Sequence, residues 1–82
     1  MQLTALEYDT LSFIAQKSKM DCWFCLVQDK NQNDYVLDLE NRKRMSIRQG
    51  VKQLVDGMTE QDWEILTREQ SFAIVKLLGY CI

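Results

Sequence analysis

Residues 22–39 read CWFCLVQDKNQNDYVLDL, in which two apolar segments flank a polar one. Residues 22–27 are apolar, aromatic or β-branched over a short length, and residues 35–39 alternate about Val36 and Asp38. Both patterns are typical of strands. Residues 28–34 between them are all polar and rich in turn formers, so the two strands are predicted to pair as an antiparallel hairpin.

A two-stranded hairpin is only marginally stable by itself, so the rest of the chain must support it. Three kinds of support are compatible with the sequence. The hairpin can pack on a helix, gain a short third strand around residues 44–47, or pair with a second copy of the chain.

Helix starts are marked by four pairs of residues with the spacing of a capping box, in which each side chain bonds the backbone N–H of the other residue. The pairs are Thr4 with Glu7, Ser46 with Gln49, Thr59 with Asp62, and Thr67 with Gln70. They predict a helix from Ala5 to about Lys17 and a second that ends near Gly57. Residues 59–79 are predicted to form either two helices or one bent helix.

The spacing of apolar residues predicts which face of each helix enters the core. For the first helix this face is Leu3, Leu6, Thr10, Phe13 and Ile14. For the second it is Ile47, Val51, Leu54, Val55 and Met58, and the last helix contributes Phe72, Val75 and Leu78. The apolar residues at the end of the chain are also expected to dock on the core, namely Tyr80, Cys81 and Ile82.

The order of these elements predicts an α+β fold, because strands and helices are segregated along the chain. We expect an N-terminal helix, an antiparallel β-hairpin that can gain a short third strand, and two or three C-terminal helices packed on the hairpin. Residues 1–82 are predicted to form a single compact α+β domain.

The composition is that of an ordinary globular domain, with 82 residues, 46% of them hydrophobic, and a formal net charge of −2. No apolar run approaches the roughly 18 residues of a membrane span, and no basic segment followed by an apolar one opens the chain. Three cysteines without a spaced framework indicate reduced thiols. We therefore expect a cytoplasmic protein without a membrane partner.

The sequence predicts no catalytic residue, no cofactor and no metal site. The chain has no His to act as a general base. Cys22 and Cys25 have the C-x-x-C spacing, but residues three apart on a strand point to opposite faces, so core packing is the expected role. Glu60 and Asp62 suit the first turn of a helix. The acidic stretch Asp56, Glu60, Asp62 and Glu64 is therefore interpreted as a solvated capping cluster.

A basic patch is the one local charge feature that suggests a ligand. Five of the ten basic residues fall within residues 42–52, namely Arg42, Lys43, Arg44, Arg48 and Lys52. Arg48 and Lys52 share a helix face, and the other three precede the N-terminus of that helix, where free N–H groups attract anions. The patch would suit a phosphate, a nucleic-acid backbone or an acidic protein surface, or it is simply a solvated polar face.

The first predicted strand offers apolar side chains on both faces, with Cys22, Phe24 and Leu26 on one and Trp23, Cys25 and Val27 on the other. Such a strand needs two covers. If the helices cover one face only, Trp23 and Val27 are left for a protein partner or a second subunit. The alternative is a hairpin that lies between helices.

Together these features predict a small non-catalytic protein-interaction module that binds a protein partner or associates with itself. Its size and compactness suggest an accessory protein of a phage or mobile element. The alternative is a nucleic-acid-associated regulator that uses the basic patch at residues 42–52. Salt-dependent binding to oligonucleotides would separate the two functions, because phosphate contacts weaken steeply as salt rises.

Overall fold

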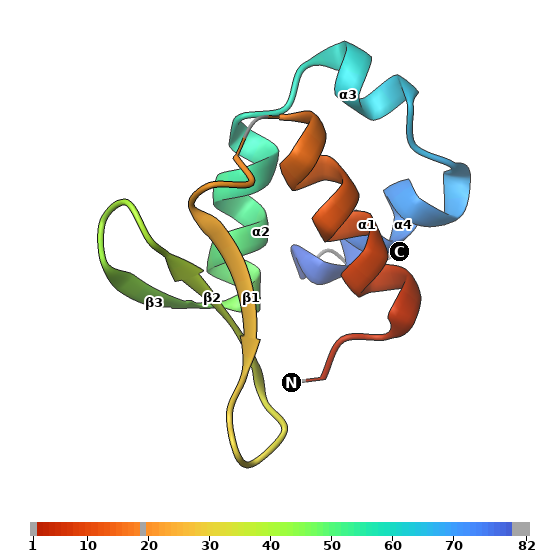
Figure 1. The fold of residues 1–82 in the computed structure, drawn as a ribbon. Coiled ribbons are helices and arrows are strands. Elements are labelled where there is room, and N and C mark those ends of the chain that lie inside the picture. Colours follow the sequence, from red (N-terminus) through yellow and green to blue (C-terminus); the bar gives the residue numbers. More distant parts are fainter. Residues whose placement is uncertain (1, 19, 80–82) are drawn as a thin grey trace.

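The computed structural model describes residues 2–18 and 20–79. Within these ranges the chain forms, in order, α1 (Ala5–Lys17), β1 (Phe24–Gln28), β2 (Asp34–Asp38), β3 (Lys43–Ser46), α2 (Ile47–Asp56), α3 (Glu60–Glu64) and α4 (Arg68–Leu77). The strands form one antiparallel sheet in the order β1-β2-β3, and the helices pack on it as a second layer (Figure 1). The predicted α+β fold is confirmed, with the third strand present and residues 59–79 forming two helices.

All four predicted capping boxes are present, so the local sequence sets where each helix begins. In each box the side chain of the N-cap residue accepts the backbone N–H of the third helical residue, whose own side chain accepts the N–H of the cap. A good N-cap contributes about 1 kcal/mol. Gly79 follows α4 with a φ of +89°, in the left-handed region that glycine occupies without a steric penalty.

The first strand begins two residues later than the sequence predicts. Trp23 and Phe24 both donate their backbone N–H to the carbonyl oxygen of Met20, at 3.1 and 2.9 Å. These bonds close a turn over residues 21–23, so Cys22 lies in the turn and is exposed. The prediction that both cysteines lie in the strand and pack in the core is therefore wrong for Cys22, while Cys25 lies in the strand and is partly buried.

The core lies between one face of the sheet and three helices. Phe24, Val36 and Met45 point inward from the three strands and are at most 6% exposed. Helices α1, α2 and α4 contribute the other fully buried large side chains, among them Leu11, Ile14, Ile47, Val51, Leu54 and Ile74.

Glycine at position 50 lets α2 lie close to the sheet. A Cβ built at this position would lie 2.7 Å from the Cβ of Val36, which is shorter than van der Waals contact. Helix α2 consequently packs directly on β2 and β3.

Two predicted core residues are exposed instead. Leu6 of α1 is 45% exposed and Phe72 of α4 is 52% exposed, while Leu11 and Ile74 are fully buried. Each helix has apolar residues around more than half of its circumference, so periodicity alone does not select the buried face. Packing selects it, because α1 and α4 contact each other and turn a different stripe inward. The predicted docking of residues 80–82 lies outside the described residues.

Candidate interaction surfaces

The outer face of the sheet is the first candidate surface. Alternation along the strands places Cys25 and Val27 of β1, and Tyr35 and Leu37 of β2, on the face opposite to that of Phe24 and Val36. The register places Cys25 opposite Leu37 and Val27 opposite Tyr35. These four side chains are partly exposed, whereas Phe24, Val36 and Asp38 on the inner face are buried. With Leu39, which is 55% exposed, they form what we call the outer sheet face.

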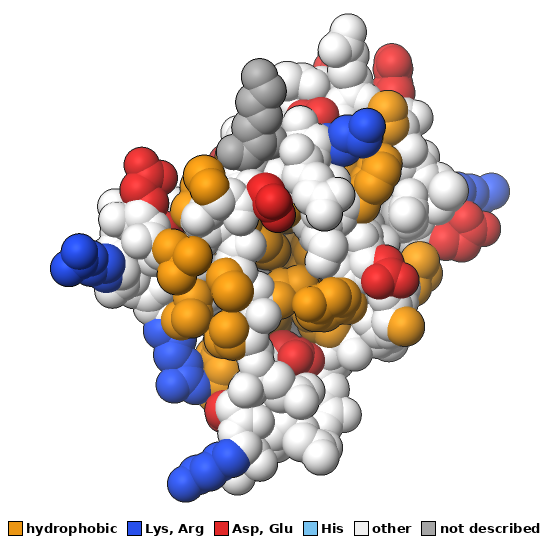
Figure 2. Space-filling view, in the orientation of Figure 1, with side chains coloured by type: hydrophobic (Ala, Val, Ile, Leu, Met, Phe, Trp, Pro, Cys, Tyr) orange, Lys and Arg blue, Asp and Glu red, His pale blue; other side chains and the backbone are white. Residues whose placement is uncertain are grey.

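Basic side chains border this face. Hydrophobic side chains gather over the sheet in Figure 2, with Lys and Arg side chains at their margin. At the turn between β2 and β3, Leu37 and Leu39 line a shallow hollow of about 380 Å³, which is completed by Asp38, Arg42, Lys43 and Arg44. The outer sheet face therefore combines an apolar centre with a rim of positive charge.

Two contacts position the Arg44 side chain on the outer sheet face. Its guanidinium carbon lies 3.5 Å from the centre of the Tyr35 ring, and one of its nitrogens lies 3.8 Å from the carboxylate of Asp29. The backbone N–H of Asn33 donates to the same carboxylate at 3.0 Å, and this bond is the main reason why the pKa of Asp29 lies below its ordinary value. The hairpin loop and the third strand are thereby joined across the sheet.

Asp38 shapes the turn that carries the basic rim. It is 2% exposed and accepts the side-chain amide of Asn41 at 2.8 Å, and the backbone N–H groups of Glu40 and Asn41 at 3.1 and 3.0 Å. These bonds favour the ionised carboxylate, so the pKa of Asp38 lies below its ordinary value, chiefly because of the Asn41 amide. Arg42 adopts a left-handed φ of 53° at the end of this turn.

The five residues of the predicted basic patch are distributed over three hollows that share lining residues. Lys43 and Arg44 share a second hollow, of about 350 Å³, with Lys52. Lys52 also lines a third hollow, of about 230 Å³, with Arg48. Asp56 lies in both of these hollows, so the positive surface includes an opposing charge.

Arg48 already has a structural neighbour. A Cβ built on Gly79 would lie 2.8 Å from the guanidinium carbon of Arg48, so this group lies against the C-terminal end of α4. Carbonyl groups there carry partial negative charge and attract a cation. Arg48 is therefore a structural contact at the end of α4 as well as a member of the patch.

Trp23 and Val27, the two residues predicted to form a hydrophobic interface, lie in different environments. Val27 lies on the outer sheet face opposite Tyr35. Trp23, in the turn before β1, is partly buried against the core and meets Phe24 edge-on at 5.8 Å between ring centres. Of the two residues, Val27 belongs to the candidate surface.

Among the described residues, the thiols and carboxylates that could take part in chemistry do not gather at one site. Cys22 and Cys25 are free thiols, and Cys81 lies outside the described residues. Within residues 2–18 and 20–79, no three His, Cys, Asp or Glu side chains gather as they would to hold a metal ion. Glu60 and Asp62 lie in the first turn of α3, where the side chain of Asp62 accepts the N–H of Thr59 at 2.9 Å.

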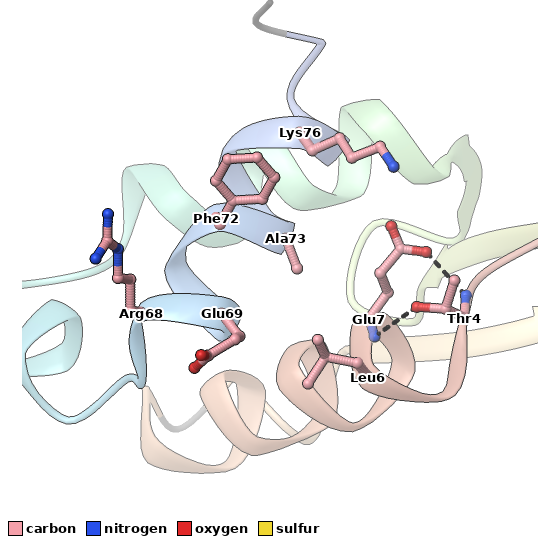
Figure 3. A pocket seen from close by; sticks show the side chains of 8 residues that line it. All are labelled: Thr4, Leu6, Glu7, Arg68, Glu69, Phe72, Ala73 and Lys76. Atoms are coloured by element: carbon pink, nitrogen blue, oxygen red, sulfur yellow. Dashed lines mark hydrogen bonds between the residues drawn. The ribbon is translucent and has the colours of Figure 1, made fainter. Parts of the chain in front are cut away.

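A second candidate surface was not found by sequence reasoning. Helices α1 and α4 flank a hollow of about 460 Å³, seen in Figure 3 and here called the α1–α4 groove. Its lining residues are Thr4, Leu6, Glu7, Arg68, Glu69, Phe72, Ala73 and Lys76. The spacing of apolar residues predicts that Leu6 and Phe72 lie in the core. On α4 the apolar residues Ala73, Ile74 and Leu77 form an alternative stripe, and this stripe is the buried one. Its presence in the sequence is the signal that could have revealed the groove.

Comparison of this chain with protein-family models, with curated proteins and with solved structures finds no match. None of the helices in the described ranges has both the length and the apolar character that a membrane span requires.

Proposed function

We propose that this chain is a small non-catalytic protein-interaction module that binds an acidic protein surface through its outer sheet face. The observation that carries the proposal is the hollow in which Leu37 and Leu39 meet the basic side chains Arg42, Lys43 and Arg44. Interfaces commonly have an apolar centre and a charged rim. A rim of one sign steers and selects a partner of the opposite sign.

The same geometry favours a protein over a nucleic acid. Tyr35 is the aromatic ring of the outer sheet face, and Arg44 covers it at 3.5 Å, so the ring is not open for base stacking. Asp56 lines the same hollow as Lys43, Arg44 and Lys52, where it would repel phosphates. The centre of the face is aliphatic, which suits a protein side chain better than a sugar-phosphate backbone. A cytoplasmic location is part of the proposal, and the free thiols of Cys22 and Cys25 support it.

The test is affinity capture from the native host with matched variants, followed by titration with the purified partner. Leu39→Asp places a charge in the apolar centre, and Ile65→Asp makes the same kind of change at a residue of similar exposure outside both surfaces. We expect a partner that binds the wild type and Ile65→Asp equally, and Leu39→Asp at least about tenfold more weakly. The binding segment of that partner should carry an excess of Asp and Glu.

Two results would contradict the proposal. One is a partner retained equally by Leu39→Asp. The other is tight, strongly salt-dependent binding to oligonucleotides that falls when Lys43 and Lys52 are changed to Glu, which would favour the nucleic-acid-associated regulator instead.

A further inference from the structure

We infer that the α1–α4 groove is the face through which two copies of this chain associate as a two-fold dimer. This inference goes beyond the proposed function, because it concerns a different surface and a different partner. The partner is a second copy rather than a foreign protein, and the reason lies in the arrangement of charge around the groove.

The centre of the groove is apolar and open. Leu6 is 45% exposed and Phe72 is 52% exposed, and Ala73, which is 7% exposed, lies beside Phe72 on α4. Figure 3 shows Leu6 on α1 and the other two residues on α4, across the groove from it. A second molecule could bury an exposed Leu and an exposed Phe in a single contact.

The spacing of charge along α4 is self-complementary. Glu69, Phe72, Ala73 and Lys76 are separated by three, four and seven positions, so they share one face of the helix. The midpoint between Glu69 and Lys76 falls between Phe72 and Ala73. If two α4 helices cross antiparallel about a two-fold axis at that midpoint, each Glu69 lies opposite Lys76 of the second copy, and each Phe72 lies opposite Ala73 of the second copy beside the axis.

The charges needed for this pairing are available. Among the described residues, neither Glu69 nor Lys76 has an ion pair within 4.0 Å in the single chain. Around the whole groove the exposed charges are those of Glu69, Arg68 and Lys76, whereas Glu7 is 8% exposed and its carboxylate accepts the N–H of Thr4. A rim with both signs in two-fold order complements itself, whereas a rim with one sign repels its own copy.

The first experiment is sedimentation equilibrium of the full chain from about 10 µM to about 1 mM, the range in which a small interface dissociates. We expect the mass to rise from that of a monomer toward twice that value. Phe72→Asp should remain monomeric at every concentration, and Ile65→Asp, with a residue of similar exposure outside the groove, should behave as the wild type. Circular dichroism checks that each variant is folded.

The second experiment reverses the paired charges. Glu69→Lys and Lys76→Glu each place like charges opposite one another twice in the dimer, so each should weaken association about tenfold. The double variant restores both pairs and should return to within about threefold of the wild type. This rescue keeps the test valid even if Phe72→Asp does not fold, because both charges are exposed.

Three results would overturn the inference: a constant monomer mass over the whole range, a dimer that survives Phe72→Asp, or a double charge reversal that fails to restore association. The inference and the proposed function fail separately. Phe72→Asp should still bind the acidic partner, and Leu39→Asp should still dimerise.

Discussion

The outer sheet face and the α1–α4 groove both leave large apolar side chains open to water, and they differ in the charges that surround them. Leu37 and Leu39 are bordered by three basic residues, with Asp38 engaged in its own turn. Leu6 and Phe72 are bordered by exposed residues of both signs, Glu69, Arg68 and Lys76, with Glu7 engaged in its capping box. On the two proposals, surfaces of similar apolar character would select different partners, because the charged rim and not the apolar centre would distinguish a foreign acidic protein from a second copy.

The fold explains why a small domain leaves two such surfaces. Three helices and a three-stranded sheet enclose one core, and the helices pack on one face of the sheet (Figure 1). The opposite face then stays open. The groove arises because α1 and α4 use their buried stripes on the core and on each other, which leaves Leu6 and Phe72 outside.

Among the changes that should affect the two surfaces differently, Gly50→Ala is expected to have the largest effect. In Gly50→Ala the new Cβ would meet Val36, which is fully buried and cannot move without shifting the sheet. Although Ala favours a helix over Gly, we expect a net loss of about 1–3 kcal/mol in the free energy of unfolding, measured by urea denaturation. The outer sheet face should lose partner binding, while the α1–α4 groove keeps its dimer.

The matched control for this prediction is Gly57→Ala, at the C-cap of α2. A Cβ there meets chiefly the flexible end of the Met20 side chain, and a φ of −92° suits any residue. This variant should be neutral or more stable by up to about 1 kcal/mol. Adding Val36→Ala to Gly50→Ala should cost less than the sum of the two single changes. Simple additivity would show that the close contact does not limit stability.

A smaller effect on stability is expected when the pH is lowered, and it arises in the turn between β2 and β3 that carries the basic rim. The pKa of Asp38 is lower in the folded chain than its ordinary value of 3.8, because the Asn41 side chain and backbone N–H groups bond the ionised carboxylate. The stability that this group contributes is therefore complete above that value and is lost as the pH falls through the lower, folded pKa. Thermal denaturation between pH 7 and about pH 2 should show this loss in the wild type.

Asp38→Asn should flatten that acid dependence without abolishing it, because the pKa of Asp29 is also lowered, chiefly by the N–H of Asn33. An unchanged pH profile in Asp38→Asn would show that the turn does not depend on the charge of Asp38. The dimer formed through the α1–α4 groove should be unaffected by this change, since Asp38 does not line it.

The smallest effect on stability is expected for Arg44→Ala. The variant loses the stacking on Tyr35 and a partly exposed ion pair with Asp29 at 3.8 Å. Together these contacts contribute no more than about 1 kcal/mol. Partner binding should weaken much more than stability does, as measured by titration calorimetry, and Lys30→Ala in the exposed hairpin loop is the control that should change neither. Unchanged partner binding in Arg44→Ala would remove Arg44 from the interface.

Much of the fold was predictable because its signals are local. A capping box involves residues three apart, so Thr4 with Glu7 and Ser46 with Gln49 mark helix starts wherever those helices pack. A polar segment between two apolar ones predicts a hairpin for the same reason. The basic rim was also readable, since Arg42, Lys43 and Arg44 are adjacent in the chain.

The sequence by itself thus determined the order of the first helix, the hairpin and the C-terminal helices, the helix starts and the position of the positive charge, while it left open the third strand and the division of residues 59–79. Tertiary packing determined which stripes of α1 and α4 are buried, and so whether Leu6 or Leu11, and Phe72 or Ile74, enter the core. The physical reason is that capping depends on neighbours along the chain, whereas burial depends on which elements meet. A helix with apolar residues on several sides can satisfy its own periodicity in more than one orientation, and only contact with the sheet and with another helix selects one.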